Sequence, residues 1–288
     1  MRKLSYGVFV TMIVVGLSLF LLGMFRMSAP KTHEAERKEV FQKVLPSTFM
    51  IQVFVGVPYP LAPELSDNES GQYLEFKDVA GKTYRLVMVA TGSGCRIGAS
   101  DRILTVKHLT AQPLNVVRVA TEYGVVQMSD LRVFYLATDH NMQGFMSELF
   151  AEDEVEDLAL LRVGSSNIPH LGPPARVSSR DVERYESVFT IGTPGAIPFI
   201  ATEGFVNAPV VSLPPYGDRT QMTLLVAQGN SGGCVFRMGT GEVVGVVSEQ
   251  SPFAPYVSYS PTLPAIRKFL ESNLPKTAPE TKGGHEAK

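Results

Sequence analysis

The stretch Gly229-Asn230-Ser231-Gly232-Gly233, which continues into Cys234-Val235-Phe236, decides how the rest of the chain is interpreted. It lies between apolar runs at 222–227 and 243–247. Glycines on both sides of a serine permit a tight turn in which successive backbone N–H groups point at one position. That position can hold the oxyanion of an acyl-transfer intermediate. An ordinary glycine-rich hairpin is the alternative, so the partners of Ser231 elsewhere in the chain decide between the two interpretations.

Composition narrows the function classes. The 288 residues have room for one large domain or two small ones. A formal net charge of -2 gives no reason to expect nucleic acid as a partner. The two cysteines, Cys95 and Cys234, lack the spacing of a metal site, so we predict neither a metal nor a cofactor.

An uncharged run from Leu4 to Phe25 lies near the start of the chain, after Arg2-Lys3 and before Arg26. A run of about 20 apolar residues spans a bilayer as a helix. A cleaved signal peptide is the alternative, but its apolar core usually has about 7–15 residues. The greater length favours an uncleaved membrane anchor at 1–26 that crosses the membrane through 4–25. Positive charge lies on both sides of the run, so its orientation stays open.

The charged segment that follows is interpreted as a juxtamembrane stalk at 27–46. Residues 32–44 are rich in Glu, Lys and Arg, with Val40 and Val44 at helical spacing, and Pro46 ends the pattern. We predict a short helix that serves mainly as a solvated spacer between membrane and domain.

Short strand-like runs then alternate with turns rich in Gly, Pro and Asp, which indicates an all-β sandwich or a pair of barrels. The stretch 263–274 is the exception, because its apolar residues recur at helical spacing and a proline follows it. The polar residues 275–288 are expected to be disordered. The strand-like runs are 50–55, 73–76, 84–91, 94–97, 103–106, 116–120, 125–128, 131–136, 158–163, 187–191, 204–206, 221–226, 233–236, 243–247 and 256–258.

His108 is the candidate base. It follows the apolar run 103–106 and precedes a loop, a position from which its ring can face a surface cleft. Imidazole titrates near neutral pH, which suits a general base. A single histidine is more often structural than catalytic, so His108 needs a partner. The other histidines, His33, His140, His170 and His285, lie in loops or near the chain ends.

Asp157 is the candidate partner, since it opens the apolar run 158–163. A carboxylate at the start of a buried strand can hold an imidazole by one nitrogen and stabilise the imidazolium formed during catalysis. The alternative treats 148–157 as one solvated acidic loop. We apply that interpretation to Glu152, Asp153 and Glu154, but not to Asp157.

His108, Asp157 and Ser231 follow one another in the chain order of chymotrypsin-type enzymes. The sequence resembles the trypsin-like serine proteases, most closely the HtrA/Deg branch. The resemblance covers five segments in the family's order: 44–47, 92–108, 157–161, 191–206 and 229–245. It implies an all-β protease domain at 47–274. That domain would comprise two six-stranded antiparallel β-barrels of the chymotrypsin/trypsin type, at about 47–175 and 176–262, and a C-terminal helix at 263–274.

The resemblance also implies the chemistry. Ser231 would be the nucleophile, His108 the general base and Asp157 its orienting carboxylate. The oxyanion hole would be the turn at Gly229, Asn230 and Ser231, with the N–H groups of Gly229 and Ser231 as donors. Substrates would be proteins or peptides. The primary pocket would be lined by Leu225, Val226, Val246, Val247 and Ser248, which predicts a preference for small or medium apolar side chains.

Four features depart from the family's pattern. Lys107 stands where the family usually has a small or amide residue, and its charge either acts on His108 or faces solvent. Cys234 stands where a proline is usual, and the loop 135–156 is longer than expected. Asn230 replaces the acidic residue that binds a newly freed N-terminus in zymogens, so we do not expect activation by cleavage. We also expect no PDZ domain.

In the resembled fold, the segments of Cys95 and Cys234 approach each other where the barrels meet. We therefore predict a disulfide, which would stabilise the fold by roughly 3–5 kcal/mol. It would also imply an oxidising compartment and place the domain on the periplasmic or extracellular side. The alternative is two buried thiols that act as small hydrophobic groups.

The sequence as a whole predicts a membrane-anchored serine endopeptidase that acts in protein quality control or regulated proteolysis. The HtrA resemblance implies a trimer. The alternative is a protease-like domain that no longer cuts and serves as a binding or scaffold module, and Lys107 is the main reason to keep it. An esterase on another fold is disfavoured, because the Ser-Asp-His order of α/β hydrolases is absent.

Overall fold

A computed structural model describes residues 33–58, 74–78, 80–98, 101–111 and 131–274. The predicted anchor at 4–25, the strand-like runs 116–120 and 125–128 and the polar tail at 275–288 lie outside the described residues. Within the described ranges, no helix has both the length and the apolar character needed to cross a bilayer.

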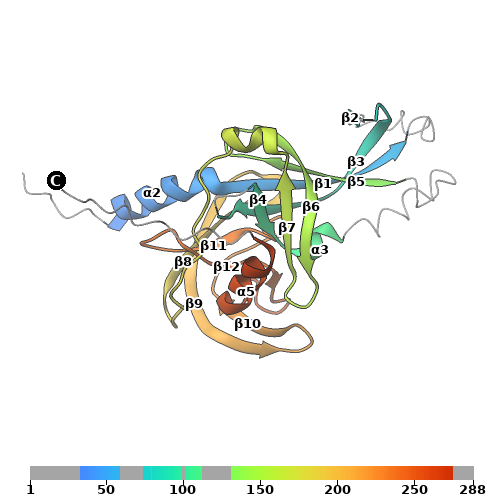
Figure 1. The fold of residues 1–288 in the computed structure, drawn as a ribbon. Coiled ribbons are helices and arrows are strands. Elements are labelled where there is room, and N and C mark those ends of the chain that lie inside the picture. Colours follow the sequence, from blue (N-terminus) through green and yellow to red (C-terminus); the bar gives the residue numbers. More distant parts are fainter. Residues whose placement is uncertain (1–32, 59–73, 79, 99–100, 112–130, 275–288) are drawn as a thin grey trace, which may run out of the picture.

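The first half of the domain is a closed antiparallel barrel (Figure 1). Strand β1 pairs with β5 on one side and with β3 on the other, so the order β1-β5-β6-β7-β4-β3 returns to its starting strand, and β2 extends the sheet beyond β3. The predicted first barrel is confirmed. Its strands are β1 (Thr48–Pro58), β2 (Leu74–Lys77), β3 (Thr83–Arg96), β4 (Arg102–Thr105), β5 (Arg132–Thr138), β6 (Gly144–Asp153) and β7 (Leu158–Val163).

The second half is a seven-stranded antiparallel sheet in the order β12-β11-β8-β9-β10-β14-β13. The sequence predicts a six-stranded barrel at this point, and the structure shows this sheet, with β13 as an edge strand. Figure 1 shows the two units side by side, with the long strand β9 curving along the second. The strands are β8 (Ser187–Gly192), β9 (Ile200–Leu213), β10 (Gly217–Met222), β11 (Cys234–Arg237), β12 (Val243–Val246), β13 (Glu249–Gln250) and β14 (Ser258–Pro261).

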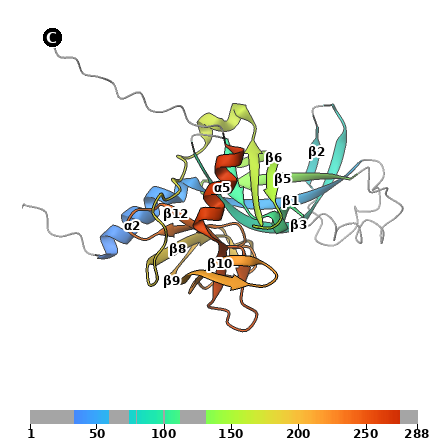
Figure 2. The same ribbon diagram turned by 60° about the horizontal axis from the view of Figure 1, so that its bottom comes forward.

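Helix α5 (Leu263–Asn273) corresponds to the helix predicted over 263–274. The side chain of Thr262 accepts a hydrogen bond from the Ala265 N–H and caps its first turn. Ile266, Phe269 and Leu270 are buried in a core cluster that includes residues of both sheets. Figure 2 shows α5 lying between the two units, so the helix helps to hold them together. The remaining short helices are η1 (Leu45–Ser47), α3 (Lys107–Thr110), η4 (Ser165–His170) and η5 (Pro194–Ala196).

Helix α2 (His33–Val44) is part of the folded domain at its C-terminal end. Val40 and Val44 are buried, and the Lys43 Nζ donates to the carbonyl of Thr240 at 2.9 Å. Gly241 has a positive φ of +71°, and a Cβ added there would lie 2.8 Å from the Val44 side chain. The interpretation of this segment as a solvated spacer is therefore wrong for its last turns, because two valines at helical spacing are enough to seat a helix on a core.

Two local predictions were wrong. The stretch 135–156 is not one long loop, because β6 pairs with both β5 and β7. The strand character of β6 is hidden in the sequence, since Phe145 is the one buried apolar side chain of that strand and Leu149 and Phe150 are exposed. The predicted strand 221–226 ends early, because β10 stops at Met222 and residues 223–226 form a loop.

A disulfide joins the two units. Cys95 in β3 and Cys234 in β11 are bonded, their Cα atoms are 5.9 Å apart, and both residues are fully buried. The predicted disulfide is confirmed. It links the strand that precedes the His108 segment to the strand that follows Ser231, so it holds the two halves of the candidate site together.

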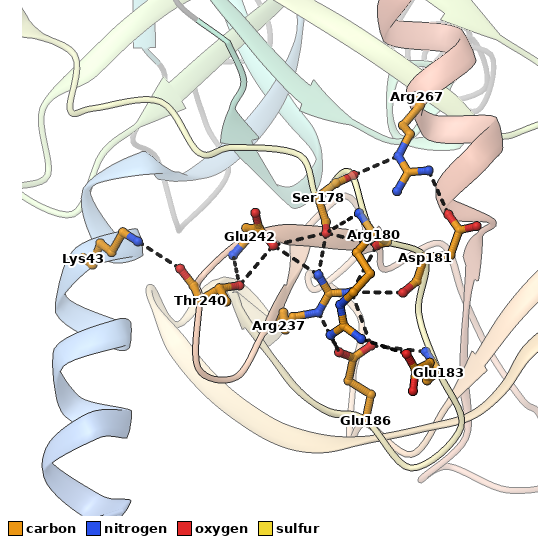
Figure 3. Close-up of polar contacts among 10 residues, drawn as sticks. All are labelled: Lys43, Ser178, Arg180, Asp181, Glu183, Glu186, Arg237, Thr240, Glu242 and Arg267. Carbon is orange, nitrogen blue, oxygen red and sulfur yellow. Dashed lines mark hydrogen bonds and ion pairs between the residues drawn. The ribbon is translucent and has the colours of Figure 1, made fainter. Parts of the chain in front are cut away.

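Arg237, at the end of β11, is the centre of a buried ionic cluster (Figure 3). Its guanidinium donates to Glu186, Glu242 and Ser178, and to the carbonyls of Arg180 and Asp181. Burial favours the neutral form of Glu186, but the hydrogen bond from Arg237, the Glu183 N–H and the nearby positive charges outweigh it and lower the pKa of Glu186. This cluster binds the segment 178–186 to the second sheet.

Candidate active site

His108 lies in the first turn of α3, directly after β4. Val106, between β4 and α3, is fully buried and extended, and the chain turns into the helix after it. Strand β4 pairs with β7 in an antiparallel register in which Thr105 faces Ala159. The end of β4 and the start of β7 are therefore adjacent, and this register brings His108 beside Asp157.

Asp157 holds His108 with both carboxylate oxygens. The Oδ2 atom lies 2.8 Å from His108 Nδ1, and Oδ1 accepts the His108 backbone N–H at 2.8 Å. Ser248 Oγ also donates to Oδ2 at 2.5 Å, and the Asp157 carbonyl accepts from the Lys107 N–H at 3.2 Å. Asp157 has a φ of +55°, a left-handed conformation that a non-glycine residue adopts at some cost. With Nδ1 facing this carboxylate, Nε2 is the ring nitrogen available to accept a proton.

The Ser231 turn is seated against the first barrel. The Ser231 carbonyl accepts from the Ser93 N–H at 2.8 Å, and the Ser93 hydroxyl donates to the Gly229 carbonyl at 2.8 Å. Gly232 has a φ of +86°, and a Cβ added there would lie 2.1 Å from the Thr105 hydroxyl oxygen. Glycine is therefore required for this close approach to β4, the strand that leads to His108.

The two N–H groups predicted as oxyanion donors have no other partner among the described residues. In the described part of the chain, the backbone N–H groups of Gly229 and Ser231 donate to no acceptor. Gly229 has a φ of +102°, which favours glycine. The Asn230 N–H instead donates to the Ala227 carbonyl at 3.0 Å. The Asn230 N–H therefore closes the turn, and the side-chain Oδ1 of Asn230 is buried without a partner in the described structure.

The predicted pocket residues separate into two groups. Val226, Val246 and Val247 are buried in the apolar clusters, whereas Leu225 is 63% exposed. Ser248 binds Asp157 and so supports the candidate base rather than offering a free hydroxyl. Sequence reasoning did not single out Gln250, whose side-chain amide donates to the carbonyls of Val226 and Pro255 and ties these two segments together.

A cleft of about 840 Å³ begins at His108 and Asp157. Its other polar and aromatic lining residues come from both units: Lys107, Glu154, Tyr216, Arg219, Ser248 and Glu249. The Lys107 ammonium pairs with Glu154 at 3.2 Å, which accounts for its charge at the edge of the cleft. In the ranges that the structure describes, no three His, Cys, Asp or Glu side chains gather as they would around a metal ion.

Arg219 fastens the loop that carries Asp157. It belongs to β10, is 1% exposed, and donates to the Val155 carbonyl at 3.1 Å and to Glu156 at 3.3 Å. Val155 and Glu156 directly precede Asp157. The sequence offered no reason to select this arginine, because a basic residue in a short polar strand usually faces solvent.

Comparisons with known proteins identify the family of this domain. Residues 92–246, more than half of the chain, match the family described as the trypsin-like peptidase domain. A probable periplasmic serine endoprotease, DegP-like, from Hahella chejuensis is 30% identical over 162 residues, which are 56% of this chain and 30% of that protein. A protein of the same description from Pseudomonas fluorescens is 31% identical over 161 residues, 55% of this chain and 29% of its own length.

A solved structure shares the fold. The serine endoprotease from Yersinia pestis has a TM-score of 0.53 and 16% identity, over 85% of this chain and 67% of that one. At this identity the likeness concerns the fold. The matched region spans less than a third of the length of the two DegP-like relatives.

Proposed function

This chain belongs to the trypsin-like peptidase family, and we propose that it is a serine endopeptidase in which Ser231, His108 and Asp157 form the catalytic triad. The observation that carries the proposal is the fixed imidazole. Asp157 holds His108 through Nδ1 at 2.8 Å and is itself held by donors from His108 and Ser248, while the Ser231 turn offers two free N–H groups. An imidazole in one tautomer beside such a turn suits acyl transfer.

The chemistry follows from these positions. The Ser231 hydroxyl attacks the substrate carbonyl while His108 Nε2 accepts its proton. The N–H groups of Gly229 and Ser231 hold the oxyanion of the tetrahedral intermediate. His108 then donates the proton to the departing amine, which leaves an acyl-enzyme on Ser231. A water molecule, deprotonated by His108, hydrolyses that ester and restores the serine.

The proposal extends to specificity. No acidic residue lies between Met222 and Gln228, the stretch before the serine turn, which supports an apolar rather than a basic residue at the cleaved position. Leu225, the exposed member of the predicted pocket, offers apolar surface there. We propose small or medium apolar side chains at this position. A cleavage profile dominated by Lys or Arg at the cleaved position would contradict this assignment.

Membrane anchoring and compartment also belong to the proposal. The uncharged run 4–25 supports an anchor at 1–26, and the segment 27–46 would connect it to the protease domain at 47–274. The buried disulfide and the periplasmic DegP-like relatives support an extracytoplasmic domain. In that setting the enzyme would act in protein quality control or regulated proteolysis, with a trimer as the assembly that the HtrA resemblance implies.

A non-cutting scaffold is the second candidate, and the observation that favoured it was Lys107. The ion pair between Lys107 and Glu154 weakens that argument, because it gives the charge of Lys107 a partner other than His108.

The decisive test is labelling of the full-length protein in detergent with a fluorophosphonate, which reacts with serines activated by a base and an oxyanion hole. We expect covalent labelling of the wild type and none of Ser231→Ala or His108→Ala. Thermal unfolding of each variant shows whether it is folded. A folded wild type that does not label would favour the scaffold.

A further inference from the structure

Most of the ionisable side chains that line the cleft beside His108 contact a partner among the described residues. Lys107 pairs with Glu154 at 3.2 Å, Arg219 with Glu156 at 3.3 Å, and Asp157 with His108 at 2.8 Å. The carboxylate of Glu249 has no hydrogen bond and no ion pair anywhere in the described part of the protein. Glu249 is therefore the carboxylate of the cleft that no described residue contacts directly.

Glu249 is also partly withdrawn from water. Its side chain is half-buried, and this burial raises its pKa. The positive charge of Arg219 opposes the shift, and the negative charge of Asp157 adds to it. A partly buried carboxylate without a partner is unfavourable, and a positive charge that entered the cleft would relieve that cost.

The backbone at Glu249 is available to an extended peptide. Glu249 and Gln250 form β13, which pairs with β14 on one side and is the edge strand of the second sheet. The preceding residue is Ser248, which binds Asp157, so the strand starts beside the candidate triad. Extended peptides bind by adding a strand to such an edge, and pockets along the edge select their side chains.

We propose that Glu249 makes this cleft a subsite for a basic side chain of the substrate. That side chain would be a lysine or an arginine at one of the positions before the scissile bond. The inference rests on the proposed endopeptidase function. A cleft of about 840 Å³ accommodates a long side chain. Tyr216 also lines it and is 49% exposed, so its ring can lie against the cationic head. The enzyme would then cut after an apolar residue in segments that carry a basic residue nearby.

The test uses the full-length protein in detergent and neutral fluorogenic peptides cut at one known bond. Lysine or norleucine, which has a similar chain but no charge, is placed singly at each of the four positions before that bond. We expect kcat/KM to be about tenfold higher for lysine at one of these positions, equivalent to about 1.4 kcal/mol. The ratio should fall to about one in Glu249→Gln. In Glu249→Lys, norleucine should be favoured over lysine.

Glu271→Gln is the matched control, because it makes the same chemical change at an exposed position on α5 and should leave the ratio unchanged. Comparing ratios within one variant cancels any loss of folded protein. A lysine preference that is equal in the wild type and Glu249→Gln would overturn the inference, as would the absence of a lysine preference at all four positions.

Fluorophosphonate labelling of the wild type separates this inference from the proposed function. If the wild type labels but shows no lysine preference, the subsite alone is wrong. If it does not label, the proposed function has failed and the subsite is judged by calorimetric binding of the lysine and norleucine peptides. Tighter binding of the lysine peptide to the wild type than to Glu249→Gln would support the site, and equal binding would overturn it.

Discussion

Arg219 and Arg237 are both buried arginines of the second sheet, yet their surroundings differ. Each nitrogen of the Arg237 guanidinium donates to an acceptor in the cluster of Figure 3. Arg219 leaves its Nε without a partner in the described structure, and its bonds lead to the first barrel, at Val155 and Glu156. Arg237 completes a local cluster, whereas Arg219 joins the two units beside the candidate triad.

Burial of a charge therefore does not by itself indicate its role. The Arg237 guanidinium pairs with two carboxylates of its own region, Glu186 and Glu242, which is typical of a structural group. Among the described residues, Arg219 in the cleft leaves one donor without a partner, and the Glu249 carboxylate has no direct partner. In the proposed subsite, a bound substrate supplies the partner of Glu249. Four predictions test this distinction and follow in order of decreasing effect.

The largest contrast is between two identical chemical changes, Asp157→Asn and Glu186→Gln. Asp157→Asn should lower turnover on the order of 10⁴-fold, because the amide stabilises the wrong imidazole tautomer. Glu186→Gln should leave turnover per folded molecule within about twofold of the wild type, because Glu186 belongs to the Arg237 cluster. The measurement is kcat, normalised to the folded fraction. Similar losses of kcat in both variants would contradict the distinction between the Arg237 cluster and the cleft.

Arg237→Met should cost roughly 3–5 kcal/mol of unfolding free energy, since it leaves Glu186 and Glu242 without their main partner. Denaturant titration followed by circular dichroism measures this loss. The fluorophosphonate labelling rate of the remaining folded protein should be unchanged within about twofold. A variant as stable as the wild type would show that the cluster contributes little.

Arg219→Met should slow fluorophosphonate labelling by about tenfold to a hundredfold, because a small misplacement of Asp157 is enough to disturb the imidazole. Arg219→Lys, which keeps the charge and one donor, should restore part of the rate. The loss should appear in kcat more than in KM. If the effect lay in KM alone, Arg219 would be a substrate contact rather than a positioning residue.

The smallest effect concerns pH. The pKa of Glu186 is lowered from its ordinary value of 4.5, so the folded state favours the carboxylate more than the unfolded chain does. Its contribution to stability is therefore present above that ordinary value and is lost as the pH falls through the folded-state pKa. At pH 7, the free energy of unfolding of the wild type should exceed that of Glu186→Gln by about 1–3 kcal/mol.

That advantage should shrink below about pH 4, which urea titrations at a series of pH values would reveal. A difference between wild type and Glu186→Gln that stays constant from pH 7 to pH 3 would mean that ionised Glu186 does not hold the cluster.

Much of the fold was predictable because the sequence patterns that indicate it are local. Glycines at 229, 232 and 233, a histidine after one apolar run and an aspartate before another each constrain the chain within a few residues. The strand β6 was missed for the same reason, because its stability comes from pairing with two neighbours while its side chains are mostly exposed.

The family, the disulfide, the closed first barrel and the candidate triad residues could be predicted from the sequence, and the catalytic roles of the triad stay predictions. The folded structure was needed to find that Ser248 supports Asp157, that Arg219 fastens its loop, and that Glu249 has no direct partner among the described residues. The cause is separation along the chain. Turns and strands depend on neighbouring residues, whereas these partners come from segments about 60 to 90 residues from Asp157 and meet it only through the packing of one sheet against the other.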